Sequence, residues 1–298
     1  MDNVLEFIGN TEIKELSNIY KKYNLKSKIF AKLELNNPTG SIKDRAAFNM
    51  IKVAEENKLI NENSVIVEAS SGNIGISLAY VGKVKNYKVI IVMPENMSKE
   101  RIKMMEDYGA QVILTSKEKG MQGAIDKVNE LLNQNKNYIC LKQFENTNNK
   151  TAHYKTGTEI INQVFNIDIF INGIGTGGTI SGVGEYLKSK NENIQIIGIE
   201  PAKSPLITKG ISSSHGIQGI GANFIPKILN LDMIDKVLTV DDEDAIFYKN
   251  ELYKEENIFC GISAGANLKI AIDIAKKEEN KNIVIIIPDK GDRYYSIN

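Results

Sequence analysis

The feature that most constrains this chain is a series of short, nearly uninterrupted apolar runs separated by segments with helical patterning. Strands buried on both faces have this composition, and the helices between them cover the two faces of a parallel sheet. The runs are SVIVEA (64–69), KVIIVM (88–93), QVILT (111–115), YICL (138–141), DIFING (168–173), IQIIGIE (194–200), KVLTV (236–240) and NIVIIIP (282–288). We therefore predict an α/β fold of the doubly wound class, with mostly parallel sheets.

The segments between the apolar runs predict helices with ordinary start and stop signals. Ser98 precedes one such segment as a helix cap, and Gly109 ends it. Further helices are expected over about 73–83, 120–134, 151–165, 178–188, 242–256 and 263–276. The stretch 200–235 contains several glycines and predicts a long irregular connection, which in compact domains is often functional. The 298 residues suffice for two domains, and without a recognisable linker these must be closely joined.

Composition narrows the class of protein. Lys and Arg together number 37, as do Asp and Glu, so no overall charge favours nucleic acid or an anionic membrane. No apolar run approaches the ~20 residues of a membrane helix, and the first residues lack the pattern of a signal peptide. Cys140 and Cys260 lack the spacing of a disulfide framework or zinc site, and His153 and His215 are the only histidines. We expect a soluble cytoplasmic protein without a metal site.

A glycine-rich turn follows the run at 168–173. The sequence GIGTGGT (173–179) would present successive backbone N–H groups at a helix N-terminus, which is how proteins hold a phosphate group. Thr176 and Thr179 would add hydroxyl donors. A tight strand-to-helix turn without a ligand is the simpler alternative.

A dinucleotide site is a second alternative for the same turn. Gly173, Gly175 and Gly178 satisfy the spacing G-x-G-x-x-G. Glu200 ends the next strand, about where an acid that binds a ribose would stand.

Two further polar loops join a strand to a helix. In EASSGNIGIS (68–77), backbone N–H groups and the hydroxyls of Ser70 and Ser71 could bind a carboxylate. In CGISAGANL (260–268), Ser263 would cap a helix, and the small residues after it would permit close approach of a ligand. Taken separately, each loop is equally typical of an ordinary helix cap.

Lys43 stands in an unusual place for a cation. In NNPTGSIKDR (36–45), Ser41 is expected to cap a helix whose first turn contains Lys43. The helix dipole and partial burial both disfavour an ammonium group there, which lowers its pKa and frees the amine to attack a carbonyl. A phosphate-binding turn, a polar loop and such a lysine together suggest pyridoxal phosphate, because its aldehyde takes a lysine and its phosphate takes the turn.

The whole chain resembles the cysteine synthase (O-acetylserine sulfhydrylase) family, within the tryptophan-synthase-β-like, fold type II pyridoxal-phosphate enzymes. The matching motifs, in order, are GNTEIKEL, NPTGSIKDR, SSGNIGI, MPENMSKERIKMMEDYGAQVILT, QFENTNN, GTGGT, GIQGIGANFIP, GISAGAN and PDKGDRYYS. The resemblance implies two α/β domains with the cofactor in the cleft between them. It implies that residues 37–143 form a smaller mobile domain, and residues 1–36 plus 144–298 a larger cofactor-binding one.

The resemblance also implies roles for individual residues. Lys43 would form the Schiff base, Asn73 would hydrogen-bond the ring hydroxyl, and Ser263 would meet the pyridine nitrogen. The phosphate would be held by Gly175, Thr176, Gly177, Gly178 and Thr179. The substrate α-carboxylate would be held by Ser70, Ser71, Gly72, Asn73 and Gln143, and the turn containing Gly219, Gly221 and Ala222 would line the space near the leaving group.

Ser70 replaces a threonine of the family pattern and keeps its hydroxyl, and two further positions near the substrate change the chemistry of the side chain. Ile74 replaces a threonine in the substrate loop, and Asn223 replaces a glycine in the sequence GIGAGFIP. Neither position belongs to the cofactor set, so the expected reaction is unchanged, whereas altered specificity and neutral drift both remain open as explanations.

The resemblance implies β-replacement on a β-substituted L-alanine. The first hypothesis is synthesis of L-cysteine and acetate from O-acetyl-L-serine and sulfide. The second takes L-cysteine as donor, releases hydrogen sulfide and forms L-serine, L-lanthionine or L-cystathionine. A non-catalytic nucleotide-binding protein is the alternative from another class. The family also leads us to expect a homodimer, which serine acetyltransferase sometimes binds.

Overall fold

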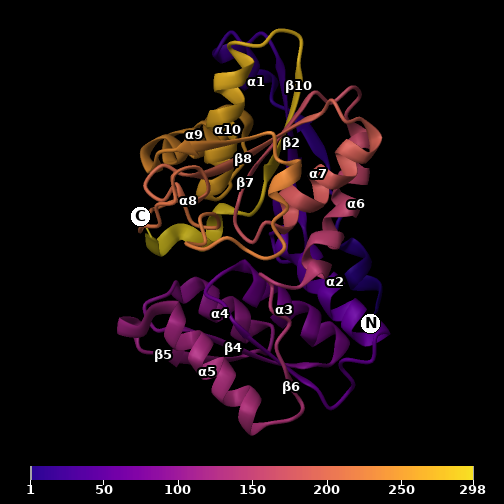
Figure 1. The fold of residues 1–298 in the computed structure, drawn as a ribbon, viewed down its shortest axis with the longest axis vertical. Coiled ribbons are helices and arrows are strands. Elements are labelled where there is room, and N and C mark those ends of the chain that lie inside the picture. The colour runs from indigo at the N-terminus through magenta and orange to yellow at the C-terminus, as the bar shows by residue number, and fades with distance from the viewer. Residues whose placement is uncertain (1, 298) are drawn as a thin grey trace.

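The chain forms two lobes, each built on its own sheet (Figure 1). The computed structural model describes the backbone of residues 2–297 and the side chains of residues 4–295. The predicted α/β class is confirmed, because both sheets are mostly parallel and helices connect their strands. In the described part of the chain, no helix is both long and apolar enough to cross a membrane.

The larger sheet has six strands, of which only the edge strand β1 is antiparallel to its neighbour. Their order is β1 (Ile13–Glu15), β2 (Lys28–Leu33), β10 (Asn282–Ile287), β7 (Ile169–Gly173), β8 (Gln195–Pro201) and β9 (Lys236–Val240). One face packs on α1 (Ser17–Lys22), α9 (Asp242–Glu256) and α10 (Ile262–Ala275), and the other on α6 (Thr147–Gln163) and α7 (Gly178–Lys190).

The residues of β10 show why this strand is apolar throughout. Ile283, Ile285 and Ile287 belong to the core on the α10 side, whereas Val284 and Ile286 belong to the core on the α7 side. Successive side chains of a strand point to opposite faces, so a strand covered on both faces is apolar at successive positions.

The smaller sheet has four parallel strands. Their order is β5 (Gln111–Thr115), β4 (Lys88–Pro94), β3 (Val65–Ala69) and β6 (Tyr138–Ile139). One face packs on α2 (Lys43–Glu56), α3 (Asn73–Lys85) and α4 (Lys99–Asp107), and the other on α5 (Gly120–Gln134). The whole sheet lies within residues 37–143, but the mobility of this region stays a prediction.

The remaining elements are short. They are the helix α8 (Leu206–Lys209) and the 3-10 helices η1 (Asp2–Phe7), η2 (Glu34–Asn36), η3 (Lys117–Lys119), η4 (Leu231–Met233) and η5 (Gly291–Ile297). Apart from α8 and η4, residues 202–235 are irregular, as predicted.

The structure differs from the sequence prediction in several elements. The prediction missed β1, β2 and α1, and β6 has only two residues where four were expected. Helix α6 begins four residues before the predicted residue 151, because the side chain of Asn146 accepts a hydrogen bond from the backbone N–H of Asn148 and caps it. Ser98 caps α4 as predicted, accepting a hydrogen bond from the N–H of Arg101.

Candidate active site

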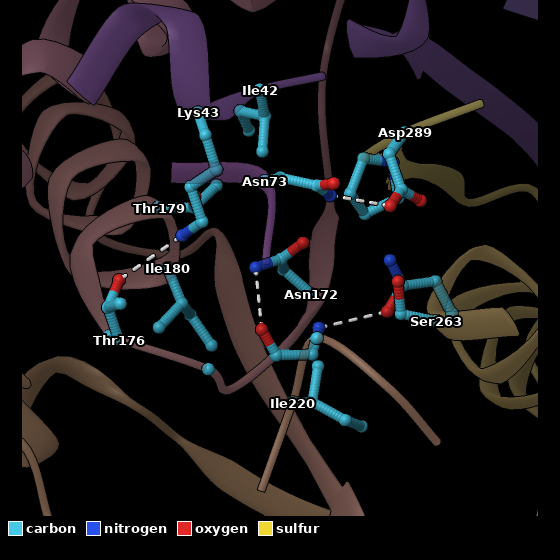
Figure 2. Close-up of a pocket in the computed structure, with 16 residues that line it drawn as sticks. Ile42, Lys43, Asn73, Asn172, Thr176, Thr179, Ile180, Ile220, Ser263 and Asp289 are labelled. Carbon is cyan, nitrogen blue, oxygen red and sulfur yellow. Dashed lines mark hydrogen bonds between the residues drawn. The ribbon is translucent and has the colours of Figure 1, made fainter. Parts of the chain in front are cut away.

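A cavity lies between the two lobes, beyond the carboxyl ends of β7 and β10, where ligands bind in open α/β sheets. Its walls come from both lobes: Lys43 and Asn73 face residues of the 172–180 segment, Ser263 and Asp289 (Figure 2). About 540 Å³ of this central cavity, counting its open mouth, is not filled by protein atoms.

Lys43 is the first residue of α2, and its side chain reaches into the central cavity (Figure 2). Its Nζ lies 3.5 Å from Oγ1 of Thr176, and it has no salt bridge in the described part of the chain. Burial lowers the pKa of Lys43 to about 8, and the negative charge of Asp289 opposes this shift. An amine with this pKa is partly uncharged near neutral pH and can act as a nucleophile or a base.

The start of α2 differs in one detail from the prediction. Ser41 does not cap the helix: the capping position is Ile42, which has helical backbone angles and contributes no side-chain hydrogen bond. The Ser41 hydroxyl instead accepts a hydrogen bond from the N–H of Lys43 at 3.3 Å. It therefore still satisfies one free backbone donor of the first turn.

The phosphate-binding turn predicted from GIGTGGT lies between β7 and α7. Gly177 has a φ of +83°, and a Cβ added to Gly175 would lie 2.4 Å from the backbone oxygen of Gly219. Both positions therefore favour glycine, Gly177 for its left-handed backbone and Gly175 for the close approach of the Gly219 backbone. No acidic residue occurs in the first turn of α7, so nothing there opposes an anion at the positive end of the helix dipole.

The predicted phosphate-binding residues are brought together, with one exception. Gly175, Thr176, Gly177 and Thr179 line the central cavity. Gly178 does not line it, because its Cα faces Asn149, whose Oδ1 would lie 2.4 Å from an added Cβ. Its role as a cofactor-binding residue, which the structure does not test, would fall to its backbone N–H.

A neutral histidine lies behind this turn. The His153 Nε2 is 3.3 Å from Oγ1 of Thr179, and its Nδ1 is 3.3 Å from Oγ1 of Thr156. Burial, followed by the charges of Arg45 and Lys43, lowers the pKa of His153 well below its ordinary value. The imidazole thus orients the Thr179 hydroxyl without adding a charge.

Asn73 and Ser263 line the cavity from different lobes. Asn73 begins α3; its Nδ2 donates to Oδ2 of Asp289 at 2.6 Å, and its Oδ1 accepts from Nη1 of Arg293 at 2.9 Å. Ser263 is the second residue of α10, so the prediction that it caps this helix is wrong: the capping position is Gly261. Ser263 lines the cavity instead, where a ligand can meet its hydroxyl.

The predicted substrate-binding residues are distributed around the cavity. Asn73 and Gly219 line it, whereas Gly221 and Ala222 line a smaller pocket next to the 200–208 segment. Ser70, Ser71, Gly72 and Gln143 are not among the residues that line either pocket.

The loop that holds Ser70 and Ser71 is braced by its own polar groups. The Ser70 hydroxyl accepts from the N–H of Gly72 at 3.2 Å, and Nη1 of Arg101 donates to the Ser71 backbone oxygen at 3.3 Å. The substrate roles of these residues stay predictions.

Glu68 was missed by the sequence reasoning, although it lies next to the end of the apolar run before the substrate loop. Its buried carboxylate accepts hydrogen bonds from the backbone N–H groups of Leu141, Lys142 and Gln143 and from the Cys140 thiol. Burial raises the pKa of Glu68, and these donors oppose the shift. Glu68 therefore ties Gln143 to the strand that carries the loop.

Asp289 was also missed as a site residue. It is 2 % exposed, lines the central cavity and lies two residues after the end of β10. Asp289 belongs to the motif PDKGDRYYS, which carries the family resemblance and could have marked it as a site residue. No local sequence pattern indicates its contact with Asn73.

The structure shows what surrounds Ile74 and Asn223, the two residues whose side-chain chemistry departs from the family pattern. Ile74 is 2 % exposed and belongs to the core below the smaller sheet, so it does not line the cavity. Asn223 has a φ of +62°, which explains why glycine is usual there, and its Oδ1 accepts from the Ser204 hydroxyl at 2.9 Å.

The dinucleotide alternative does not fit this geometry. The carboxylate of Glu200 accepts hydrogen bonds from the N–H groups of Ile207 and Thr208 and from the Thr208 hydroxyl. It lines the smaller pocket, not the central cavity. Among the described residues, no group of three or more His, Cys, Asp or Glu side chains could hold a metal ion.

The arrangement fits a coenzyme that carries both an aldehyde and a phosphate. An amine of lowered pKa lies beside a glycine-rich turn that is open to an anion, and the cavity between them is lined by an amide and a hydroxyl. Fold and site together define an α/β enzyme whose lysine and phosphate-binding turn meet between two parallel sheets.

Comparisons with known proteins identify this class. Residues 4–289 match the family "Pyridoxal-phosphate dependent enzyme". The chain is 52 % identical over 297 residues to cysteine synthase B of Campylobacter jejuni, covering 99 % of this chain and 97 % of that one. The chain belongs to the family of pyridoxal-phosphate-dependent enzymes.

Solved structures agree with this assignment. Cysteine synthase from Entamoeba histolytica superimposes with a TM-score of 0.97 at 39 % identity, covering 99 % of this chain and 89 % of that one. A hydrogen sulfide-producing enzyme from Fusobacterium nucleatum superimposes with a TM-score of 0.93 at 42 % identity, covering 99 % of each chain.

Proposed function

We propose that the protein is a cysteine synthase, which converts O-acetyl-L-serine and sulfide to L-cysteine and acetate. The observation that carries this proposal is the position of the Lys43 amine, 3.5 Å from Thr176 at the phosphate-binding turn, with a pKa lowered to about 8. The likeness to cysteine synthases over nearly the whole chain supports the choice of reaction.

Pyridoxal phosphate, when bound, supplies an electron sink that acidifies the α-proton of an amino acid attached to it. The residues that would hold it are Lys43 at the aldehyde, Asn73 at the ring hydroxyl, Ser263 at the ring nitrogen and the 175–179 turn at the phosphate. The task of Lys43 in the reaction is to accept the substrate α-proton as the β-substituent leaves. Its lowered pKa suits this task, because only the uncharged amine can take a proton.

Ser263 supports β-replacement over other reactions of this coenzyme. A carboxylate at the ring nitrogen would keep that nitrogen protonated and strengthen the electron sink. The Ser263 hydroxyl is neutral, so it leaves the nitrogen largely unprotonated. Prompt loss of a β-substituent is then favoured over transamination or racemisation.

The residues next to the cavity would bind the substrate. Backbone N–H groups and hydroxyls of the 70–73 loop, with Gln143, would hold the α-carboxylate. Glu68 would fix the distance between these two parts, since it lies near the end of β3 and accepts a hydrogen bond from the backbone N–H of Gln143 at 3.3 Å. The Gly219–Ala222 turn would leave room for the acetate group.

A second candidate function is β-replacement with L-cysteine as donor, which releases hydrogen sulfide. The structural likeness to a hydrogen sulfide-producing enzyme at 42 % identity favours retaining it. The test measures two rates for the purified enzyme. The first is the formation of L-cysteine from O-acetyl-L-serine and sulfide, and the second is the release of sulfide from L-cysteine alone. Faster cysteine formation supports the first proposal, and faster sulfide release supports the second.

The proposal extends to organisation and partners. We infer that residues 37–143 close on residues 1–36 and 144–298 when substrate binds, because both parts contribute walls to one cavity. From the family resemblance we also propose a cytoplasmic homodimer, which serine acetyltransferase could bind. Light scattering of the purified enzyme, alone and with that partner, tests the assembly.

A further inference from the structure

The η5 segment contacts the smaller lobe through Arg293. This side chain is fully buried, and its Nη1 and Nη2 donate to Oδ1 of Asn73 at 2.9 Å and to the backbone oxygen of Thr39 at 2.5 Å. Gly40 makes room for it, because an added Cβ there would lie 2.9 Å from Nη2 of Arg293. A cation is thus held against the amide of a cavity residue.

The two neighbours of Asn73 leave its amide a single orientation. Guanidinium can only donate hydrogen bonds, so the atom that faces Arg293 must be the amide oxygen. An ionised carboxylate can only accept, so the atom that faces Asp289 at 2.6 Å must be the amide nitrogen (Figure 2). A reversed amide would place its nitrogen against the Arg293 guanidinium, so that two donors meet, and its oxygen against the Asp289 carboxylate, so that two acceptors meet.

Asp289 is itself held in place. Its Oδ2 also accepts from the hydroxyl of Tyr294 at 2.6 Å, and its side chain is 2 % exposed. Of the two hydrogens on the Asn73 nitrogen, Asp289 takes one. The other remains for a ligand in the cavity that Asn73 and Asp289 both line.

We propose that Arg293 and Asp289 are positioning residues that turn Asn73 into an obligate hydrogen-bond donor toward an oxygen anion of the bound coenzyme. The inference rests on the proposed function, in which this anion is the ring oxygen of pyridoxal phosphate. A donor held at that oxygen favours its ionised form. An amide free to rotate could present its own oxygen and would lose this preference.

The experiment uses the enzyme loaded with pyridoxal phosphate and records the ratio of the near-ultraviolet to the visible absorption band of the bound coenzyme at fixed pH. The ionised ring oxygen absorbs in the visible band. The Arg293→Gln variant is expected to raise this ratio about tenfold, as for the loss of one hydrogen bond to a charged group. Arg293→Lys keeps the cation and should restore most of the visible band.

Tyr295→Ala is the matched control. Tyr295 lies in the same η5 segment and is 64 % exposed, and its ring packs on Phe259, away from Asn73. It should leave the absorption ratio unchanged. If Arg293→Gln does not fold, Arg293→Met keeps a long side chain, removes the obligate donor and should shift the ratio in the same direction.

The outcomes separate this inference from the proposed function. A loaded Arg293→Gln enzyme with the spectrum of the unmodified enzyme, or a shift no larger than that of Tyr295→Ala, overturns the positioning role and leaves the function intact. An unmodified enzyme that binds no pyridoxal phosphate overturns the proposed function itself.

Discussion

Lys43 and Lys32 are both buried lysines, and their surroundings show what separates a reactive amine from a structural one. Burial lowers the pKa of both side chains, for Lys43 to about 8. The Lys32 Nζ is fully buried and donates to Oε2 of Glu159 at 2.8 Å and to the backbone oxygen of Thr11 at 2.6 Å. Lys43 has a cavity beside it and one hydroxyl within 3.5 Å.

The cluster around Lys32 is closed by further charges. Arg45 donates to Glu34 at 2.7 and 2.8 Å and to Glu159 at 2.6 and 2.8 Å. Burial raises the pKa of Glu159, but the hydrogen bond and charge of Arg45 outweigh it and lower this pKa to about 2. A lowered lysine pKa therefore does not identify a reactive amine by itself; an open side and the absence of a bonded carboxylate are also needed.

The strongest test of this comparison replaces the reactive amine. Lys43→Ala should lower cysteine formation by roughly a thousandfold or more, because the enzyme loses both its coenzyme link and its base. Borohydride reduction followed by mass spectrometry should no longer find coenzyme on this peptide. Lys52→Ala is the control, since Lys52 lies on the same helix and its ion pair with Glu56 is exposed. Near-normal turnover by Lys43→Ala would refute the role.

The second test breaks the structural cluster. Glu159→Gln leaves Lys32 and Arg45 without one of their carboxylate partners, and removing one partner of a buried ion pair costs about 3–5 kcal/mol. Urea denaturation should show this loss in the free energy of unfolding. Glu56→Gln, in an exposed pair, should change it by less than about 1 kcal/mol. Equal effects of the two variants would mean that the cluster contributes no more than a surface pair.

The third test uses pH to compare Lys43 with an unperturbed lysine. Below a pKa of about 8 the Lys43 amine is mostly protonated, so attachment of pyridoxal phosphate to the coenzyme-free protein should slow about tenfold per pH unit. Above about pH 8 the dependence on this amine should level off. Nα-acetyl-lysine, with a pKa of about 10.4, should keep gaining reactivity beyond that point. Parallel profiles for the two amines would contradict the lowered pKa.

The smallest effect concerns the charge opposite Lys43. Asp289 raises the pKa of Lys43 against the larger effect of burial, so Asp289→Asn should move the midpoint of the attachment profile below pH 8. The expected shift is less than about one pH unit, because a single charge acts across the cavity. Stopped-flow absorbance of the attachment reaction, followed across the same pH range for both proteins, records it. A midpoint that moves upward would show that Asp289 does not act through its charge.

The sequence predicted the α/β class and the cavity residues that a local pattern marks. It did not predict the elements and residues whose roles depend on contacts with distant parts of the chain. The 173–179 turn and Lys43 are marked by glycines and a helix start. The central strand β2 was missed because Lys32 interrupts its apolar pattern, and the ion pair with Glu159 that makes this tolerable is distant in sequence. The contacts of Asn73 with Asp289 and Arg293 have no local signature either.

The pairing of β2 with β10 has a consequence for how the protein is made. Residues 28–33 leave the ribosome long before their parallel neighbour at 282–287 has been translated. Until then β2 lacks a partner on that side, and contacts so distant along a chain form slowly. The unpaired apolar edge of β2 must therefore be protected from aggregation until β10 has been made. Chaperone dependence should be highest just before β10 emerges.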